Sequence, residues 1–235
     1  MTDPFPQRRY IWGRRQSRPL KDNQRKALDE LWPQISLELP ENSLVDLAGL
    51  FVSPPEDIWL EIGFGGGEHL AAQAALHPSI GFIGCEPFVN GVASLLVHIQ
   101  EIGLTNIRVV RDDARLLVAR IPDQSVGRIF VLFPDPWPKK RHNKRRIIEK
   151  EMVTAFARIL KSDGALFMAT DDEAYAYWMQ AVMEDDPAYE LDLGGRKDVY
   201  ERPDNWPNTR YEQKGISQGR ASVYLVYKKK FLNTF

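Results

Sequence analysis

The chain has 235 residues, of which 43% are hydrophobic and 27% are charged, so it can bury a sizeable core in one large α/β domain. No apolar run approaches the roughly 20 residues of a membrane span, and the first residues lack the apolar segment of a secretion signal. The single cysteine, Cys85, excludes an internal disulfide framework. We expect a cytoplasmic protein in which Cys85 is a small core residue at a strand end.

The net charge is only −1, but the basic residues are segregated. One group lies between Arg8 and Lys26, and another lies between Lys139 and Arg146. Such patches can neutralise phosphates locally, although a solvated charged face is the ordinary alternative. Residues 1–21 also lack apolar periodicity, so we predict a flexible basic arm over 1–21 and a single domain over 22–235.

After the arm, predicted helices and strands alternate along the chain. A first helix is expected over 22–31, capped by Asp22 and ended or kinked by Pro33. Strands are expected over 58–62, 81–85, 107–110, 128–133, 164–169 and 221–227. Helices are expected over 68–76, 89–102, 114–119, 145–160 and 173–183. Apolar strands alternating with amphipathic helices predict a doubly wound, Rossmann-like α/β fold with a mostly parallel sheet, which the last strand can join antiparallel.

A glycine-rich turn, EIGFGGG over 61–67, follows the first strand. Gly63 and Gly65 are candidate ligand contacts because glycine allows a close approach of the backbone, although a tight strand-to-helix turn is the alternative. A dinucleotide-binding turn would need glycine at position 68, where Glu68 stands. A carboxylate there repels a pyrophosphate but tolerates a cationic ligand. The turn therefore favours S-adenosylmethionine, a phosphate-free sulfonium, over a nicotinamide dinucleotide.

Acidic residues stand at the ends of the first three predicted strands. Glu61 ends the first, Glu86 follows the second, and the doublet of Asp112 and Asp113 follows the third. A carboxylate after the second strand can accept hydrogen bonds from both ribose hydroxyls. One after the third can reach an adenine amino group. Each acid alone is equally well a surface residue or a helix cap, but their succession indicates a nucleoside-type cofactor.

The fourth predicted strand runs into a stiff loop, FPDPWP over 133–138. Its three prolines fix φ and remove backbone donors, so the loop suits the positioning of Asp135 and Trp137. Six of the next eight residues, 139–146, are basic. We expect them to contact phosphates and to draw an RNA substrate toward Asp135.

Five segments together resemble the bacterial tRNA (guanine-N7-)-methyltransferase family, and they span nearly the whole chain. They are RRQSRPL over 14–20, EIGFGGG over 61–67, FPDPWPKKRHNKRR over 133–146, ATD over 169–171 and TRYEQKG over 209–215. The resemblance implies methyl transfer from S-adenosylmethionine to N7 of a guanosine in the variable loop of tRNA (nucleotide 46 in tRNA numbering). We expect seven strands in the sheet, no metal, no membrane contact, and a monomer or homodimer.

The resemblance also implies roles for individual residues. Asp135 matches a catalytic position that contacts both cofactor and base. The implied cofactor ligands are Glu61, Gly63, Gly65, Glu86, Asp113 and Asp135. The implied substrate-binding residues are Lys139, Asp171, Thr209, Arg210, Tyr211 and Glu212. Two doublets leave the choice of carboxylate open; Asp113 is favoured over Asp112 because Ala114 begins a helix, and Asp171 over Asp172 because it directly follows Ala-Thr.

Guanine N7 carries a lone pair and no proton, so methylation there needs no general base. We therefore expect Asp135 to orient the base and to stabilise developing charge. Trp137, Tyr211 or Trp206 are candidates to stack on a base that has left its stack. Two alternatives stay open: methylation of an adenine amino group, and an RNA-binding module with an idle cofactor fold.

Overall fold

The computed structural model describes residues 11, 15–204, 206–207 and 209–230, which fall into two units, Met1–Pro122 and Asp123–Phe235. Most of the predicted arm, residues 1–10 and 12–14, lies outside the described residues, and the division into an arm and one domain stays a prediction. No helix in the described ranges is long and apolar enough to cross a bilayer.

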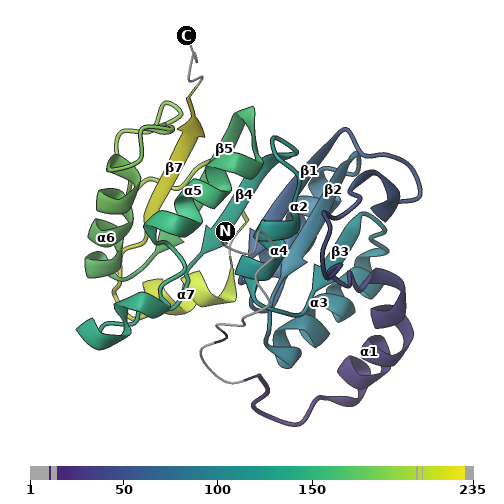
Figure 1. Cartoon of the computed structure of the whole chain (residues 1–235). Coiled ribbons are helices and arrows are strands. Elements are labelled where there is room, and N and C mark those ends of the chain that lie inside the picture. Colours follow the sequence, from purple (N-terminus) through teal and green to yellow (C-terminus); the bar gives the residue numbers. More distant parts are fainter. Residues whose placement is uncertain (1–10, 12–14, 205, 208, 231–235) are drawn as a thin grey trace. The chain divides into compact units, whose positions relative to one another are not determined.

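The first unit is a parallel three-stranded sheet with helices packed on it. Its strands are β1 (Asp57–Ile62), β2 (Ile80–Cys85) and β3 (Ile107–Val110), in the order β3-β2-β1. Its helices are α1 (Asp22–Ile35), α2 (Glu68–Leu76), α3 (Val89–Ile102) and α4 (Ala114–Arg120), with a short 3₁₀ helix, Ala48–Leu50. All but the first residue of β1 and of β2 are buried, as expected for parallel strands covered on both faces. Helix α1 packs along α3 (Figure 1).

Helix α1 is longer than the sequence predicts. It begins after Lys21, whose backbone N–H donates to Gln24 Oε1 at 3.1 Å, so Asp22 lies in the first turn and is not the cap. The helix also continues through Pro33 to the buried Ile35. A proline this close to a helix end removes only one intrahelical hydrogen bond, and burial of Ile35 keeps the last turn in place.

The chain just before α1 is hydrogen-bonded to the start of α3. The Arg15 carbonyl accepts from Val89 N at 2.9 Å. Asn90 Oδ1 accepts from Ser17 N at 3.1 Å, and Asn90 Nδ2 donates to the Arg18 carbonyl at 2.9 Å. These bonds place residues 15–18 beside the helix that follows β2.

The second unit contains four strands, β4 (Val126–Leu132), β5 (Leu160–Thr170), β6 (Tyr189–Leu191) and β7 (Val223–Lys229), in the order β4-β5-β7-β6. Strand β7 is antiparallel to both neighbours, which confirms the predicted antiparallel strand near the C-terminus. The units contribute three and four strands to a seven-stranded mixed sheet, the predicted fold class. The helices of this unit are α5 (Lys150–Ile159), α6 (Glu173–Glu184) and α7 (Arg210–Ser217), with a 3₁₀ helix, Lys140–Arg145.

One further helix boundary was predicted wrongly, and one strand was not predicted. The helix expected from residue 145 begins at Lys150, because the backbone of Arg146 is extended (φ −59°, ψ 139°) at the end of the 3₁₀ helix. Strand β6 was not predicted, because three residues are too few to show a period. Cys85, in contrast, is 1% exposed at the end of β2, as predicted.

The two left-handed glycines Gly67 and Gly103 allow a matched test of packing in the first unit. Their φ angles are similar, +81° and +77°. A Cβ on Gly67 would lie 2.7 Å from Leu95 Cβ, whereas one on Gly103 would meet nothing within 4 Å. Gly103→Ala should therefore lower the free energy of unfolding by about 1 kcal/mol through backbone strain alone. Gly67→Ala should lower it by about 2–4 kcal/mol because overpacking is added. Urea unfolding measures both values, and equal losses would contradict the packing account.

Candidate active site

The glycine turn of the first unit presents bare backbone to solvent. Gly63 and Gly65 are exposed and left-handed, with φ of +71° and +55°. A Cβ on either would meet nothing within 4 Å, so the space over the turn is open to a ligand. Gly63 N donates to the Cys85 carbonyl at 2.8 Å, which fixes the turn at the carboxyl ends of β1 and β2.

Glu86 ties this turn to the end of β2. The backbone N–H of Gly65 donates to Glu86 Oε2 at 3.0 Å, and that of Phe88 donates to Oε1 at 3.0 Å. The carboxylate is only 9% exposed, so both bonds offset the cost of burying its charge. A carboxylate oxygen accepts more than one hydrogen bond, so the ribose-binding role of Glu86 stays a prediction.

Gly91, which sequence reasoning missed, lets α3 approach the turn. A Cβ at Gly91 would lie 2.2 Å from the Gly65 carbonyl oxygen and 3.4 Å from Glu86 Cγ. Only a residue without a side chain fits this contact. A glycine in the first turn of a helix, three residues after the helix cap Phe88, is the available sequence signal, but it does not identify the contacted turn.

Glu61 is paired inside the first unit. Its Oε2 lies 2.7 Å from Nδ1 of His69 on α2, and the two residues are 3% and 2% exposed. A buried carboxylate needs such a partner, and the histidine holds it at the base of the glycine turn. His69 is a second residue that sequence reasoning missed, because nothing in the sequence pairs it with Glu61.

Asp113 is the N-cap of α4, and Ala114 begins that helix as predicted. Its Oδ1 accepts from Arg115 N at 2.9 Å, and the Arg115 guanidinium lies 3.6 Å away. Asp112 instead accepts from Asp113 N at 2.8 Å. Burial raises the pKa of the Cys85 thiol, and the negative charges of Glu86 and Asp113 raise it further. Both carboxylates therefore influence this buried thiol at the end of β2.

In the second unit, the loop over 133–138 is held in an unusual conformation. Phe133 and Trp137 have φ of +50° and +46°, which non-glycine residues rarely adopt. Phe133 N donates to the Ala169 carbonyl at 2.7 Å, which fixes the loop beside the end of β5. Asp135 lies between the two strained residues and is exposed, so its carboxylate is accessible to a ligand.

The basic segment over 139–146 divides into an exposed and a buried part. Lys139, Lys140, Arg141 and Lys144 are exposed. Partial loss of hydration, followed by the charges of surrounding cations including Arg145 and Arg141, lowers the pKa of His142. Arg146, expected to contact phosphate, is only 6% exposed. That expectation was wrong for Arg146, because its side chain is packed against aromatic rings of the same unit.

The structure separates the roles of Asp171 and Asp172. Asp172 is the N-cap of α6, and its Oδ1 accepts from Tyr175 N at 2.8 Å. Asp171 forms an ion pair with Arg220 at 2.9 Å. Burial raises the pKa of the nearby Tyr211 hydroxyl, and the charge of Asp171 adds to the rise. Tyr211 itself is 51% exposed and its ring lies 5.6 Å from that of Phe133.

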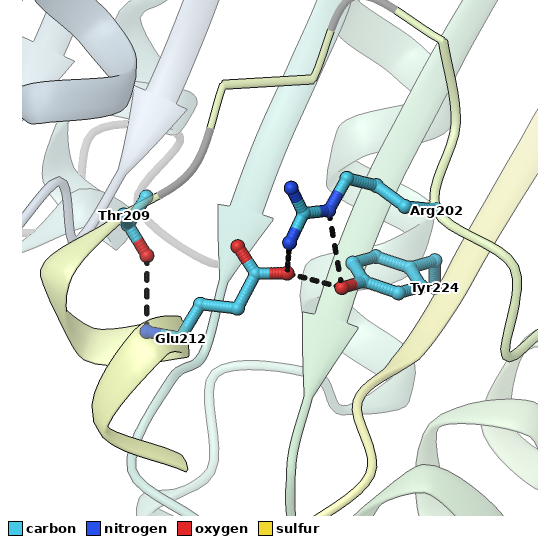
Figure 2. Close-up of polar contacts among 4 residues, drawn as sticks. All are labelled: Arg202, Thr209, Glu212 and Tyr224. Carbon is cyan, nitrogen blue, oxygen red and sulfur yellow. Dashed lines mark hydrogen bonds and ion pairs between the residues drawn. The ribbon is translucent and has the colours of Figure 1, made fainter. Parts of the chain in front are cut away.

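Residues 209–212 lie at the start of α7, a helix that is not among those predicted from the sequence. Thr209 is the N-cap of α7, and its hydroxyl accepts from Glu212 N at 3.2 Å (Figure 2). The sequence signal was present, because Thr-x-x-Glu is a helix-start pattern. Arg210 and Tyr211 are exposed on the first turn, whereas Thr209 is 9% and Glu212 is 0% exposed.

Figure 2 shows the Glu212 carboxylate pointing toward Arg202 and Tyr224. Glu212 Oε1 accepts from Arg202 Nη2 at 2.7 Å and from the Tyr224 hydroxyl. Burial lowers the pKa of Arg202, but its bonds to Tyr224 and Glu212 outweigh this and raise it overall. Glu212 therefore anchors α7 from below. Trp206 is likewise packed inside this unit, 7% exposed with its ring 5.6 Å from Tyr224, so it does not present a surface for stacking.

Comparison with known proteins places the chain among methyltransferases. A family model described as "Putative methyltransferase" matches residues 55–225. A tRNA (guanine-N(7)-)-methyltransferase from Rhodospirillum rubrum is 43% identical over 94% of this chain and 88% of its own length. One from Paramagnetospirillum magneticum is 46% identical over 95% and 94%. The crystal structure of the 16S rRNA methyltransferase KamB has a TM-score of 0.58 at 15% identity, covering 83% of this chain and 99% of its own, which shows the shared fold.

The Glu212–Arg202 pair should show strong energetic coupling. Glu212→Gln should lower the free energy of unfolding by about 2–4 kcal/mol, because it leaves Arg202 without its buried counter-charge. Arg202→Met should do the same, and the double variant should lose less than the sum of the two. Urea unfolding of the four proteins gives the coupling energy. Additive losses would contradict the account of Glu212 as a paired anchor.

Proposed function

Since the chain belongs to the tRNA (guanine-N(7)-)-methyltransferase family, we propose that it transfers the methyl group of S-adenosylmethionine to N7 of a guanosine in tRNA. The guanosine is the one at nucleotide 46, in the variable loop. Similarity to the two curated relatives over nearly the full length of each protein is the observation that carries this proposal.

The residues of the first unit fit this methyl donor. The exposed backbone at Gly63 and Gly65 leaves room over the turn. Glu61, Glu86 and Asp113 provide carboxylates, which suit an α-amino group, ribose hydroxyls and an adenine amino group in that order. Glu68 begins α2 where a phosphate-binding turn needs a donor, so the turn suits a cation without phosphates. When bound, S-adenosylmethionine supplies an electrophilic methyl group on its sulfonium.

The second unit supplies the residues for the RNA. Exposed Lys139, Lys140, Arg141 and Lys144 contact phosphates, which gives affinity without reading sequence. Tyr211, half exposed on the first turn of α7, offers a ring for stacking on an unstacked base. Asp171, Thr209 and Arg210 are the further substrate contacts, and Glu212 supports them from beneath.

Asp135 serves the reaction by orientation and charge. Guanine N7 has a lone pair and no proton, so no residue has to act as general base. The stiff loop holds the Asp135 carboxylate in one place, and a correctly oriented base saves about 7–11 kcal/mol of the barrier in favourable cases. The guanine ring becomes cationic as N7 gains the methyl group, and the negative charge of Asp135 stabilises this development.

The product tests the proposal. The purified chain is incubated with labelled S-adenosylmethionine and an unmodified tRNA transcript, and the nucleosides are separated and identified by mass spectrometry. We expect 7-methylguanosine as the methylated nucleoside. Asp135→Asn should slow single-turnover methyl transfer at least about 100-fold, whereas the exposed Asp163→Asn in the same unit should not. Methylated adenosine would overturn the proposal in favour of amino-group chemistry, and cofactor binding without any transfer would indicate an idle cofactor fold.

A further inference from the structure

Arg146 is the one buried residue of the basic segment over 139–146. It is 6% exposed, although arginine is almost never buried unless it is paired. Its guanidinium carbon lies 4.9 Å from the ring centre of Tyr175 and 4.7 Å from that of Trp178, both on α6. A planar guanidinium is suited to such stacking, whereas an ammonium group is not.

The same side chain is bonded to the loop that carries Asp135. Arg146 Nε donates to the carbonyl oxygen of Pro136, the residue directly after Asp135, at 2.8 Å. Three prolines leave this loop few backbone donors of its own, and Phe133 and Trp137 are left-handed on either side of Asp135. Such a conformation persists only where surrounding contacts impose it.

Helix α6, whose rings pack against Arg146, is also bonded to Ile148, two residues after Arg146. Trp178 Nε1 donates to the Ile148 carbonyl at 2.8 Å, and Ile148 N lies 3.5 Å from the Tyr175 hydroxyl. Helix α6 also begins at Glu173, two residues after Asp171, with Asp172 as its cap. Arg146 thus joins the loop that carries Asp135 to helix α6, which begins just after Asp171, a proposed substrate-binding residue.

We propose that Arg146 is a positioning residue for methyl transfer: it clamps the loop over 133–138 to Tyr175 and Trp178 and so sets where the Asp135 carboxylate stands. This inference rests on the proposed role of Asp135. Arg146 acts through the loop and does not contact phosphate, unlike its exposed basic neighbours.

A matched pair of variants separates positioning from phosphate binding. Arg146→Met and Arg141→Met remove the same charge from the same segment, one from a buried and one from an exposed position. Arg146→Met should slow single-turnover transfer roughly 10- to 100-fold, since a misplacement of about 1 Å has an effect of that size. Its tRNA affinity and the salt dependence of that affinity should stay near those of the unmodified chain. Arg141→Met should weaken tRNA binding and reduce the salt slope by about one.

Two further comparisons tie the effect to Asp135. Arg146→Lys should not restore the rate, because lysine keeps the charge but lacks the planar group. In an Asp135→Asn background, Arg146→Met should add less than about a twofold loss, because the residue through which it acts is already gone. If Arg146→Met lowers the melting temperature so far that it cannot be assayed, Trp178→Leu removes one side of the clamp and should give a smaller loss of rate that also vanishes in the Asp135→Asn background.

The inference is overturned if Arg146→Met transfers at nearly the normal rate, if Arg146→Lys restores the rate, if the two losses are additive, or if the salt slope falls as it does for Arg141→Met. An Asp135→Asn variant that transfers normally would instead overturn the proposed role of Asp135.

Discussion

The cost of burying a carboxylate organises both units of this protein. Removing an ionised carboxylate from water costs free energy, which hydrogen bonds or an opposite charge must offset. Each buried acid described here forms hydrogen bonds or an ion pair within its own unit, and the partners differ from one acid to the next. The pairs are Glu61 with His69 on α2, Glu86 with the N–H groups of Gly65 and Phe88, Asp113 with the first turn of α4, and Glu212 with Arg202 and Tyr224. These contacts fix the glycine turn, the start of α4 and the start of α7, which carry groups that we propose contact the ligands.

The exposed groups depend on these buried ones. Gly63 and Gly65 can offer bare backbone to a cofactor because Glu86 holds the turn open and Gly91 lets α3 lie against it. Arg210 and Tyr211 stand on a helix turn that Thr209 caps and Glu212 anchors. Among the acids implied by the resemblance, Asp135 alone is exposed, and its position depends on a strained loop. In the second unit, anchoring and ligand contact are therefore assigned to different residues, whereas in the first unit Glu86 both anchors the glycine turn and is proposed to contact the cofactor.

Much of this arrangement is visible in the sequence, because strand ends and turns are local features. The alternation of apolar strands and helices predicts the fold class, and α2, α3 and β3 have the predicted bounds. The partners of the acids are not predictable in the same way. Arg146 is one of six basic residues in a short run, and only the fold brings Tyr175 and Trp178, about thirty residues later, against it. Helix α7 is not among the predicted helices, although Thr-x-x-Glu is a helix-start pattern, because it is short and follows a segment rich in proline and polar residues.

The central claim is that this scaffold directs a methyl group to one guanine of tRNA. The most direct test is single-turnover transfer to two matched transcripts, one with the guanosine at nucleotide 46 replaced by adenosine and one with a guanosine of another loop replaced in the same way. The account predicts that the first replacement abolishes methyl incorporation and that the second leaves it intact. Undiminished incorporation into the transcript without that guanosine would contradict it.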